Sequence, residues 1–401
     1  MGAQDTVKLL LDGIEWAVEA PYADALARDF LGAVPDLATH PQATLVKRSL
    51  QRTVYRVALA DGSRVIVKVY HVRGWKERVK RLLFGPKPQI EWAASHRVLA
   101  LGIPASHAIA VGRPSPPSDT LEGYLVIEVL PDITTLGSYL RTLAAAPDSD
   151  PRAAARRVLH ELAAFVRRLH DRGVSHHDLH LGNILARASA PSADQRFLIV
   201  DLHRIRAGRP PSPRHRASAI AQLLHGLSPG LALDLRAAAA EFLDAYAAAG
   251  APLASSHLST AAILAAMARR AAKRLDSRAR RCLANSTQFA VEHLSGWRIY
   301  HRRDHSAEDI LALWTRHREA APPTVARLPD GLELRQYPRR GILARLLARS
   351  PAVRDYAAAH RAHTRGATGG PQAIAAAECL RGPDRGRSFA LLACDQGLQA
   401  R

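Results

Sequence analysis

The sequence predicts an α+β protein in which a small antiparallel-sheet lobe precedes a larger helical lobe. Apolar and β-branched residues between positions 44 and 70 are typical of strands. Residues 153–171 have the amphipathic spacing of a long helix, and the chain from there to about residue 300 is rich in Ala and Leu. Strands followed by helices, rather than alternating with them, favour this fold class.

The small lobe is predicted from a hairpin, a helix and a final strand. The hairpin strands, 53–59 and 64–70, flank a turn at Asp61-Gly62. Residues 88–101 have helical spacing, and Gly102-Ile103-Pro104 is a typical helix stop. We expect four regions: an N-terminal helical extension (1–40), the small lobe (41–132), the helical lobe (133–305) and a C-terminal region (324–401).

Composition and charge limit the class of protein. The chain has 401 residues, of which 47% are hydrophobic and 23% charged, as in soluble globular proteins of two or three folding units. A formal charge of +20 favours an acidic partner, although the abundance of Arg and Ala is also typical of GC-rich bacterial genomes. Aromatic residues make up only 5%, so no nucleic-acid partner is predicted.

Two short motifs carry the predicted chemistry. The first runs from His176-His177-Asp178 to Asn183, and Asp201 follows the Asn by eighteen residues, after an apolar strand at 197–200. In a protein-kinase-like site, the first Asp accepts the proton of the acceptor hydroxyl, while the Asn and the second Asp hold Mg²⁺ against the phosphates of ATP. Each carboxylate alone could be a turn or cap residue, but their joint order predicts a kinase-like fold with Asp178 as catalytic base.

Two histidines of the first motif, His176 and His180, are expected to support catalysis. His176 is expected to hold the loop by hydrogen bonding. His180 occupies the position where protein kinases usually carry Lys, which argues against a Ser/Thr protein kinase.

Lys68 lies within the apolar strand 65–70, where an ammonium group is costly to bury unless it is paired. Its expected partners are the ATP phosphates and Glu91 on the following helix. Glu77 is a second candidate for the acid, and the sequence leaves this choice open.

The loop expected to cover the phosphates, residues 47–55, contains no glycine, unlike the loop of protein kinases. Backbone amides near Ser49 and the side chain of Arg52 are expected to bind phosphate instead. Residues 124–130, including Glu128, are expected to provide the backbone hydrogen bonds to adenine.

With these residues in place, the chain from about 44 to 300 resembles the bacterial lipopolysaccharide core kinases, which phosphorylate heptose or Kdo sugars. The resemblance rests on four segments: Val67-Lys68-Val69-Tyr70, the helix leading to Leu101-Gly102-Ile103-Pro104, His176-His177-Asp178-Leu179-His180 and Asp201-Leu202-His203-Arg204. It implies ATP and Mg²⁺ as cofactors and a core-sugar hydroxyl as acceptor, and the Asp201-Leu202-His203-Arg204 segment favours heptose.

Two other functions stay open. An aminoglycoside- or choline-kinase-type phosphotransferase would share the Asp178, Asn183 and Asp201 order, but such enzymes bind cationic acceptors, which a charge of +20 disfavours. A catalytically silent kinase-like binding protein would suit the glycine-free loop.

A basic segment near the end of the helical lobe would suit lipopolysaccharide phosphates or an anionic bilayer, or would be a solvated helix face. The sequence has no signal-peptide pattern, no apolar run long enough to span a bilayer and no paired cysteine spacing. We therefore expect a cytoplasmic protein, with peripheral contact at the inner face of the inner membrane as an alternative. The basic segment comprises Arg269, Arg270, Lys273, Arg274, Arg278, Arg280 and Arg281.

Residues 324–401 are predicted to be a degenerate copy of the small lobe. Leu334-Arg335-Gln336-Tyr337 matches Val67-Lys68-Val69-Tyr70, and residues 355–361 match 91–97. Arg335 thus stands in place of Lys68, and no counterpart of the catalytic motif follows it in this sequence. The copy is not expected to catalyse alone.

Overall fold

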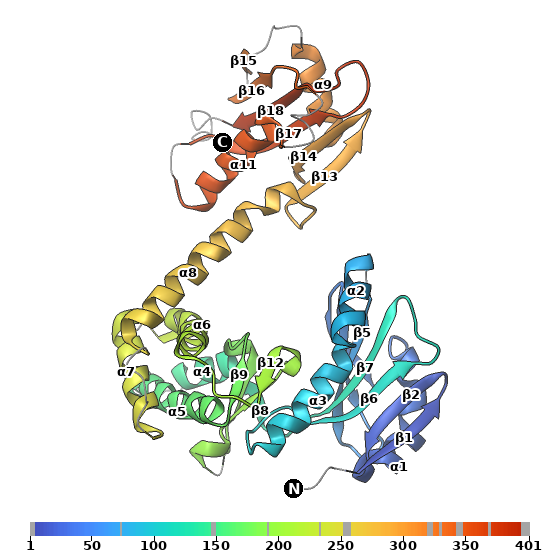
Figure 1. Cartoon of the computed structure of the whole chain (residues 1–401), viewed down its shortest axis with the longest axis vertical. Helices are drawn as coiled ribbons and strands as arrows, with labels where there is room; N and C mark the ends of the chain where they lie inside the picture. The colour runs from blue at the N-terminus through green and yellow to red at the C-terminus, as the bar shows by residue number, and fades with distance from the viewer. Residues whose placement is uncertain are drawn as a thin grey trace. The chain divides into compact units, whose positions relative to one another are not determined.

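The computed structural model describes residues 5–72, 74–145, 150–190, 192–231, 234–251, 258–318, 324–328, 331–341, 348–367 and 370–393. The chain divides into two compact units, Met1–Met267 and Ala268–Arg401. The boundary falls within helix α8, Thr260–Ala279 (Figure 1). No helix in the described ranges is long and apolar enough to cross a membrane.

The first unit begins with a seven-stranded antiparallel sheet in the order β1-β2-β6-β7-β5-β4-β3. Along β7, Val126 packs with α1 and η1, while Leu125 and Ile127 face the other side, near α3. The two faces of the sheet are therefore covered by different helices. The elements are β1 (Thr6–Leu11), β2 (Ile14–Glu19), α1 (Ala20–Asp29), η1 (Leu31–Asp36), β3 (Ala43–Arg48), β4 (Arg52–Ala58), β5 (Arg64–His71), α2 (Gly74–Phe84), α3 (Lys87–Ala100), β6 (Ala108–Pro114) and β7 (Leu121–Glu128).

The N-terminal segment is not the helical extension expected for residues 1–40. Strands β1 and β2 form a hairpin whose two-residue turn, Asp12-Gly13, has φ values of 48° and 71°. Such positive φ values match the twist of a tight hairpin, and Asp-Gly is a favoured sequence for them. Because β2 also pairs with β6, the small lobe starts well before residue 41.

The helical lobe packs around α5, whose buried face includes Leu159, Leu162 and Phe165. Asp150 caps this helix by accepting a hydrogen bond from the amide of Arg152. Two short antiparallel pairings, β10 with β11 and β9 with β12, hold the loops that carry the motifs. The elements are β8 (Ile133–Thr135), α4 (Leu136–Ala144), α5 (Pro151–Asp171), β9 (Val174–His176), η2 (Leu181–Asn183), β10 (Ile184–Arg187), η3 (Ala193–Gln195), β11 (Phe197–Ile199), η4 (Leu202–Arg204), β12 (Ile205–Ala207), α6 (Pro213–Leu231), α7 (Leu235–Ala248) and the start of α8.

The second unit contains a six-stranded antiparallel sheet in the order β13-β14-β17-β18-β16-β15. One face packs on α9 through Trp314, and the other on α11 through Tyr356. Its elements are η5 (Arg281–Leu283), β13 (Phe289–Leu294), β14 (Trp297–Arg302), α9 (Ala307–His317), β15 (Thr324–Arg327), β16 (Leu332–Tyr337), α11 (Pro351–Thr364), β17 (Gln372–Cys379) and β18 (Ser388–Ala393).

Residues 289–302 were expected in the helical lobe, and this expectation is wrong. They form the β13–β14 hairpin, whose turn at Ser295-Gly296 again has positive φ, 47° and 83°. The second sheet therefore begins before residue 324. Residues 394–401 of the expected copy, and Asp330 within it, lie outside the described residues.

Candidate active site

Lys68 forms a buried ion pair with Glu91. Its Nζ donates to Glu91 Oε1 at 2.5 Å, and the two side chains are 10% and 1% exposed. The Tyr70 hydroxyl donates to the other oxygen of Glu91. A buried charge is tolerated only when it is paired and hydrogen-bonded, so this contact holds Lys68 in place. Between the two acids left open by the sequence, Glu91 is the partner; the side chain of Glu77 lies outside the described ones.

Asp201 lies beside this pair, and Arg52 holds both of its carboxylate oxygens. Arg52 Nη1 is 2.8 Å from Oδ1, and Nη2 is 3.2 Å from Oδ2. Lys68 Nζ lies 3.8 Å from Oδ1, and His203 Nδ1 lies 2.9 Å from it. Burial alone would raise the pKa of Asp201, but the hydrogen bonds from His203 and Arg52 and the charge of Lys68 hold it well below its usual range. Asp201 is therefore ionised.

The backbone of Asp201 is in the left-handed region, with φ of 63° and ψ of 55°. This conformation is uncommon for a residue other than Gly, and strain of this kind gathers at functional sites. It places the carboxylate at the end of β11, next to the network of Lys68 and Arg52.

Asp178 occupies the loop after β9, where its carboxylate is 34% exposed. Gln222 Nε2 donates to its Oδ1 at 2.6 Å, and Arg204 Nη1 lies 3.5 Å from Oδ2. One oxygen is thus fixed by a buried amide, while the other faces a cation on the more open side.

His176 and Asn183 hold the backbone of this loop. His176 Nδ1 accepts from the Asp178 amide at 3.1 Å, so Nε2 carries the proton and donates to the Val200 carbonyl at 3.0 Å. Burial lowers the pKa of His176, which favours this neutral form. Asn183 Nδ2 donates to the Asp178 carbonyl at 2.9 Å, which leaves its side-chain oxygen available to a further partner.

Three residues predicted for the site have other partners. The amide and hydroxyl of Ser49 both donate to the Arg52 carbonyl, at 2.9 and 3.0 Å, so this amide is not open to phosphate as expected. His180 Nδ1 accepts from the Gly182 amide, which gives it a local turn contact. Glu128 donates its amide to the His107 carbonyl and contacts His107 Nδ1 at 3.0 Å through its carboxylate. This amide is therefore not available to adenine.

Sequence reasoning missed Gln222. It lies on α6 and is only 4% exposed, although its neighbours Ile220 and Leu223 belong to the apolar core. A Gln within such a buried run is a usable signal, because buried amides need hydrogen-bond partners.

The residues around Asp201 suit a divalent cation. Ligand atoms of Glu91, Asp201 and His203 lie within 4.8 Å of one another. A carboxylate and an amide oxygen, such as those of Asp201 and Asn183, are the ligand types that Mg²⁺ prefers. Arg52 already places a positive group on both Asp201 oxygens, which shows that this carboxylate attracts a cation.

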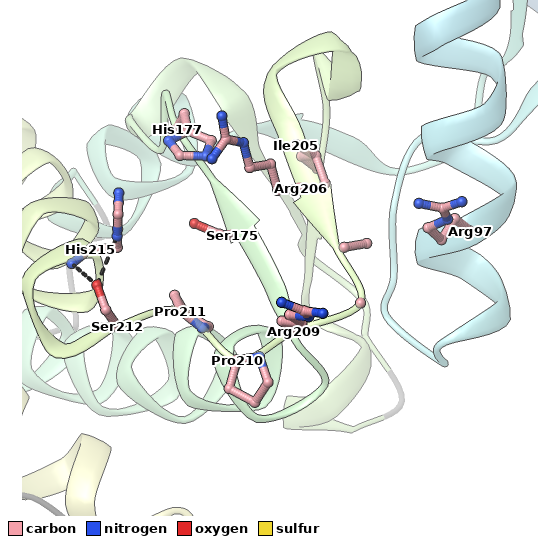
Figure 2. Close-up of a pocket in the computed structure, with 12 residues that line it drawn as sticks. Arg97, Ser175, His177, Ile205, Arg206, Arg209, Pro210, Pro211, Ser212 and His215 are labelled. Atoms are coloured by element: carbon pink, nitrogen blue, oxygen red, sulfur yellow. Dashed lines mark hydrogen bonds between the residues drawn. The ribbon is translucent and has the colours of Figure 1, made fainter.

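A basic pocket of about 640 Å³ adjoins the loop on the side of His177 (Figure 2). Three arginines, Arg97, Arg206 and Arg209, supply its positive charge, and no carboxylate lines it among the described residues. Burial, together with the charges of Arg206 and His215, lowers the pKa of His177. The lowered pKa favours the neutral form of His177, so the positive charge of this pocket comes from its arginines.

Comparison with models of known protein families shows which family the chain belongs to. Residues 39–246, which are 208 of the 401, match the model of the lipopolysaccharide kinase (Kdo/WaaP) family. The chain belongs to this family. The resemblance inferred from the motifs is confirmed, and so is the kinase-like α+β fold of the first unit, in which a sheet lobe is followed by motif loops and a helical lobe.

Relatives within the Kdo/WaaP family include two curated core heptose(I) kinases named WaaP. The Pseudomonas aeruginosa protein is 29% identical over 150 residues, or 36% of this chain and 55% of its own. The Escherichia coli protein is 27% identical over 135 residues, or 32% and 50% of the two chains. The chain thus spans about half the length of these relatives. A solved structure of WaaP in complex with acyl carrier protein is 27% identical and has a TM-score of 0.45, covering 64% of this chain and 98% of that one.

Proposed function

We propose that this Kdo/WaaP-family chain is an ATP- and Mg²⁺-dependent kinase that phosphorylates a heptose hydroxyl of the lipopolysaccharide inner core. The observation that carries the proposal is the joint presence of the Lys68–Glu91–Asp201 network and the Asp178–Asn183 loop in one unit. Both curated relatives are named as heptose(I) kinases, which supports heptose over Kdo.

Asp178 is the proposed base. Gln222 fixes Oδ1, so the acceptor hydroxyl would donate its proton to Oδ2 on the more exposed side. A carboxylate held in one orientation contributes mainly by positioning the acceptor oxygen toward the phosphate.

Lys68 is the proposed phosphate anchor. Glu91 on α3 contacts both Lys68 and Tyr70 on β5, which joins the helix to the strand. The ammonium group of Lys68 can therefore contact nucleotide phosphates while it stays paired with Glu91. Asp201 and Asn183 would hold Mg²⁺, which when bound neutralises charge on the phosphate oxygens. Arg52 would turn from Asp201 toward the same phosphates.

The alternatives have less support. The positive pocket beside His177 would repel an aminoglycoside or choline, because both are cations. A silent binding protein would have no need for the ionised Asp201 together with a paired Lys68 and an oriented Asp178.

Phosphate transfer to a defined acceptor tests the proposal. The full chain is incubated with ATP, Mg²⁺ and core oligosaccharide carrying unphosphorylated heptose, and products are identified by mass spectrometry. Parallel reactions contain a Kdo-only acceptor, choline or an aminoglycoside. We expect transfer to the heptose acceptor alone, and its loss in Asp178→Asn with ATP binding retained. Equal transfer to the Kdo-only acceptor would contradict the sugar, and an active Asp178→Asn would contradict the base.

We also propose that the second unit is a second small lobe. Its strand order, β13-β14-β17-β18-β16-β15, repeats β1-β2-β6-β7-β5-β4. In this shared order β16 corresponds to β5, and β18 corresponds to β7. Arg335 on β16 pairs with Ala390 on β18, just as Lys68 on β5 pairs with Leu125 on β7. Both lobes also open with six-residue strands joined by a two-residue turn.

The polar cluster of the second lobe supports the same proposal. Arg335 Nη1 lies 3.8 Å from Asp355 Oδ2, and the Tyr337 hydroxyl donates to Asp355, as Lys68 and Tyr70 do with Glu91. Arg335 also contacts Glu333, so two acids share its charge. We propose that this lobe binds no nucleotide. Equilibrium dialysis should give one ATP analogue per chain, and a second site abolished by Arg335→Met would contradict this.

A further inference from the structure

Helix α2 exposes apolar side chains on the outside of the small lobe. Val79 is 44% exposed, Leu82 86%, Leu83 69% and Phe84 72%, and none of the described side chains of α2 is buried. Figure 1 shows the helix extending beyond the strands of its lobe. The apolar side of a surface helix usually packs on the core, so an exposed apolar end of this size indicates a partner.

The apolar residues of α2 follow a helical spacing. Val79, Leu82 and Leu83 are separated by three and four residues, which places them on one side of the helix. Phe84 lies off this stripe but is also exposed, so the last three residues of the helix are all apolar and exposed.

Two arginines on another side tie α2 to the protein. Arg78 Nη2 lies 3.3 Å from Asp119 Oδ1, and Arg81 Nη1 donates to the Ser118 carbonyl at 3.1 Å. Both partners belong to the connection between β6 and β7. These contacts orient the helix with its apolar stripe directed away from the lobe.

The charges of α2 favour a lipid surface as the partner. Its eleven residues include four basic residues and one acid, in a chain of net charge +20. Helices that combine basic residues with Trp, Phe and Leu bind in the interface of anionic bilayers, where each Lys or Arg contributes about 1 kcal/mol. An apolar end that extends beyond a single stripe suits a fluid interface better than a preformed protein groove.

We propose that α2 docks the protein on an anionic membrane surface by inserting Val79, Leu82, Leu83 and Phe84 at the headgroup boundary. The helix leads through Gly85-Pro86 into α3, which carries Glu91, so the docking element and the Lys68 pair belong to consecutive helices. The docking itself does not depend on the proposed reaction.

Vesicle binding of the full chain tests this inference. Sedimentation with phosphatidylcholine–phosphatidylglycerol vesicles is compared with pure phosphatidylcholine, for wild type and for Leu82→Ser/Leu83→Ser/Phe84→Ser. The matched control is Leu10→Ser/Leu45→Ser/Leu50→Ser, whose side chains are 68%, 50% and 67% exposed on the same lobe. Because all six side chains are exposed, both variants should keep the wild-type Tm.

We expect the α2 variant to bind anionic vesicles at least about tenfold more weakly and the control to bind as wild type does. Equal binding by the α2 variant, or an equal loss in the control, would overturn the inference. Acidic acyl carrier protein is titrated in parallel. If the α2 variant lost binding to that protein while its vesicle binding stayed unchanged, the partner would be a protein and the membrane proposal would be wrong.

Discussion

Arg52 and Asp201 form a bidentate ion pair, although 149 residues separate them in sequence. The guanidinium group occupies both carboxylate oxygens, at 2.8 and 3.2 Å, which are the oxygens that would face a metal ion. If Asp201 holds Mg²⁺ as proposed, Arg52 would compete with the ion for the same two oxygens.

Replacing Arg52 should strengthen metal binding in the absence of nucleotide. Arg52→Gln removes the competing charge, so Mn²⁺, used as a spectroscopic substitute for Mg²⁺, should bind several-fold more tightly by electron paramagnetic resonance. Arg56→Gln is the control, because Arg56 lies on the same strand and is exposed. Equal Mn²⁺ affinities in wild type and Arg52→Gln would show that Arg52 does not compete with the metal ion for Asp201.

Asp201 should make stability depend on pH. Its pKa is depressed in the folded protein, so its ionised form contributes stability above the unfolded-state pKa of about 3.9 and loses it as pH falls toward the folded value. The free energy of unfolding of wild type should therefore fall more steeply than that of Asp201→Asn between about pH 5 and pH 2. Urea titrations at several pH values measure this difference, and parallel curves would argue against the shift.

Gln222 should act as a positioning residue for Asp178. In Gln222→Leu the carboxylate loses its only buried amide donor in the described structure, so kcat should fall by about tenfold to a hundredfold. The KM for ATP should stay close to wild type, since Gln222 has no contact with Lys68 or Asp201 among the described residues. A merely structural role would instead lower the Tm and change both constants together.

The basic segment should bind anionic lipopolysaccharide. Arg278, Arg280 and Arg281 are all exposed, so changing them together to Ser should weaken binding to lipopolysaccharide vesicles without affecting ATP affinity. Added salt should reproduce the loss in wild type, because screening acts on exposed charges. If binding at low salt were unchanged, this segment would be a solvated helix face.

Sequence patterns predicted the parts of the site that depend on short-range order. The spacing of the two motifs picked out Asp178, Asn183 and Asp201 as candidates, and the strand pattern picked out Lys68. Their catalytic roles stay predictions. The choice of Glu91 over Glu77 needed the packing of α3 on the sheet, and Gln222 reaches Asp178 across 44 residues. Such contacts depend on tertiary structure, which local spacing does not encode.

Other differences between prediction and structure lie at tight turns. Asp12-Gly13 and Ser295-Gly296 are turn sequences, yet residues 1–40 and 289–302 were expected to be helical. Backbone amides near Ser49 were expected to bind phosphate, but the amide of Ser49 itself donates to the Arg52 carbonyl within a tight turn.

The proposed correspondence between Lys68 and Arg335 has a practical use in chemical labelling. The chain has only seven lysines, and the second unit contains one of them, Lys273, which is exposed on α8 rather than in the sheet. An amine-reactive ATP analogue that acylates the lysine at a nucleotide site would modify Lys68, whereas the guanidinium of Arg335 is inert to it. Peptide mapping after such a reaction would therefore measure nucleotide binding at Lys68. The peptide that contains Arg335 would stay unmodified and would serve as an internal negative control.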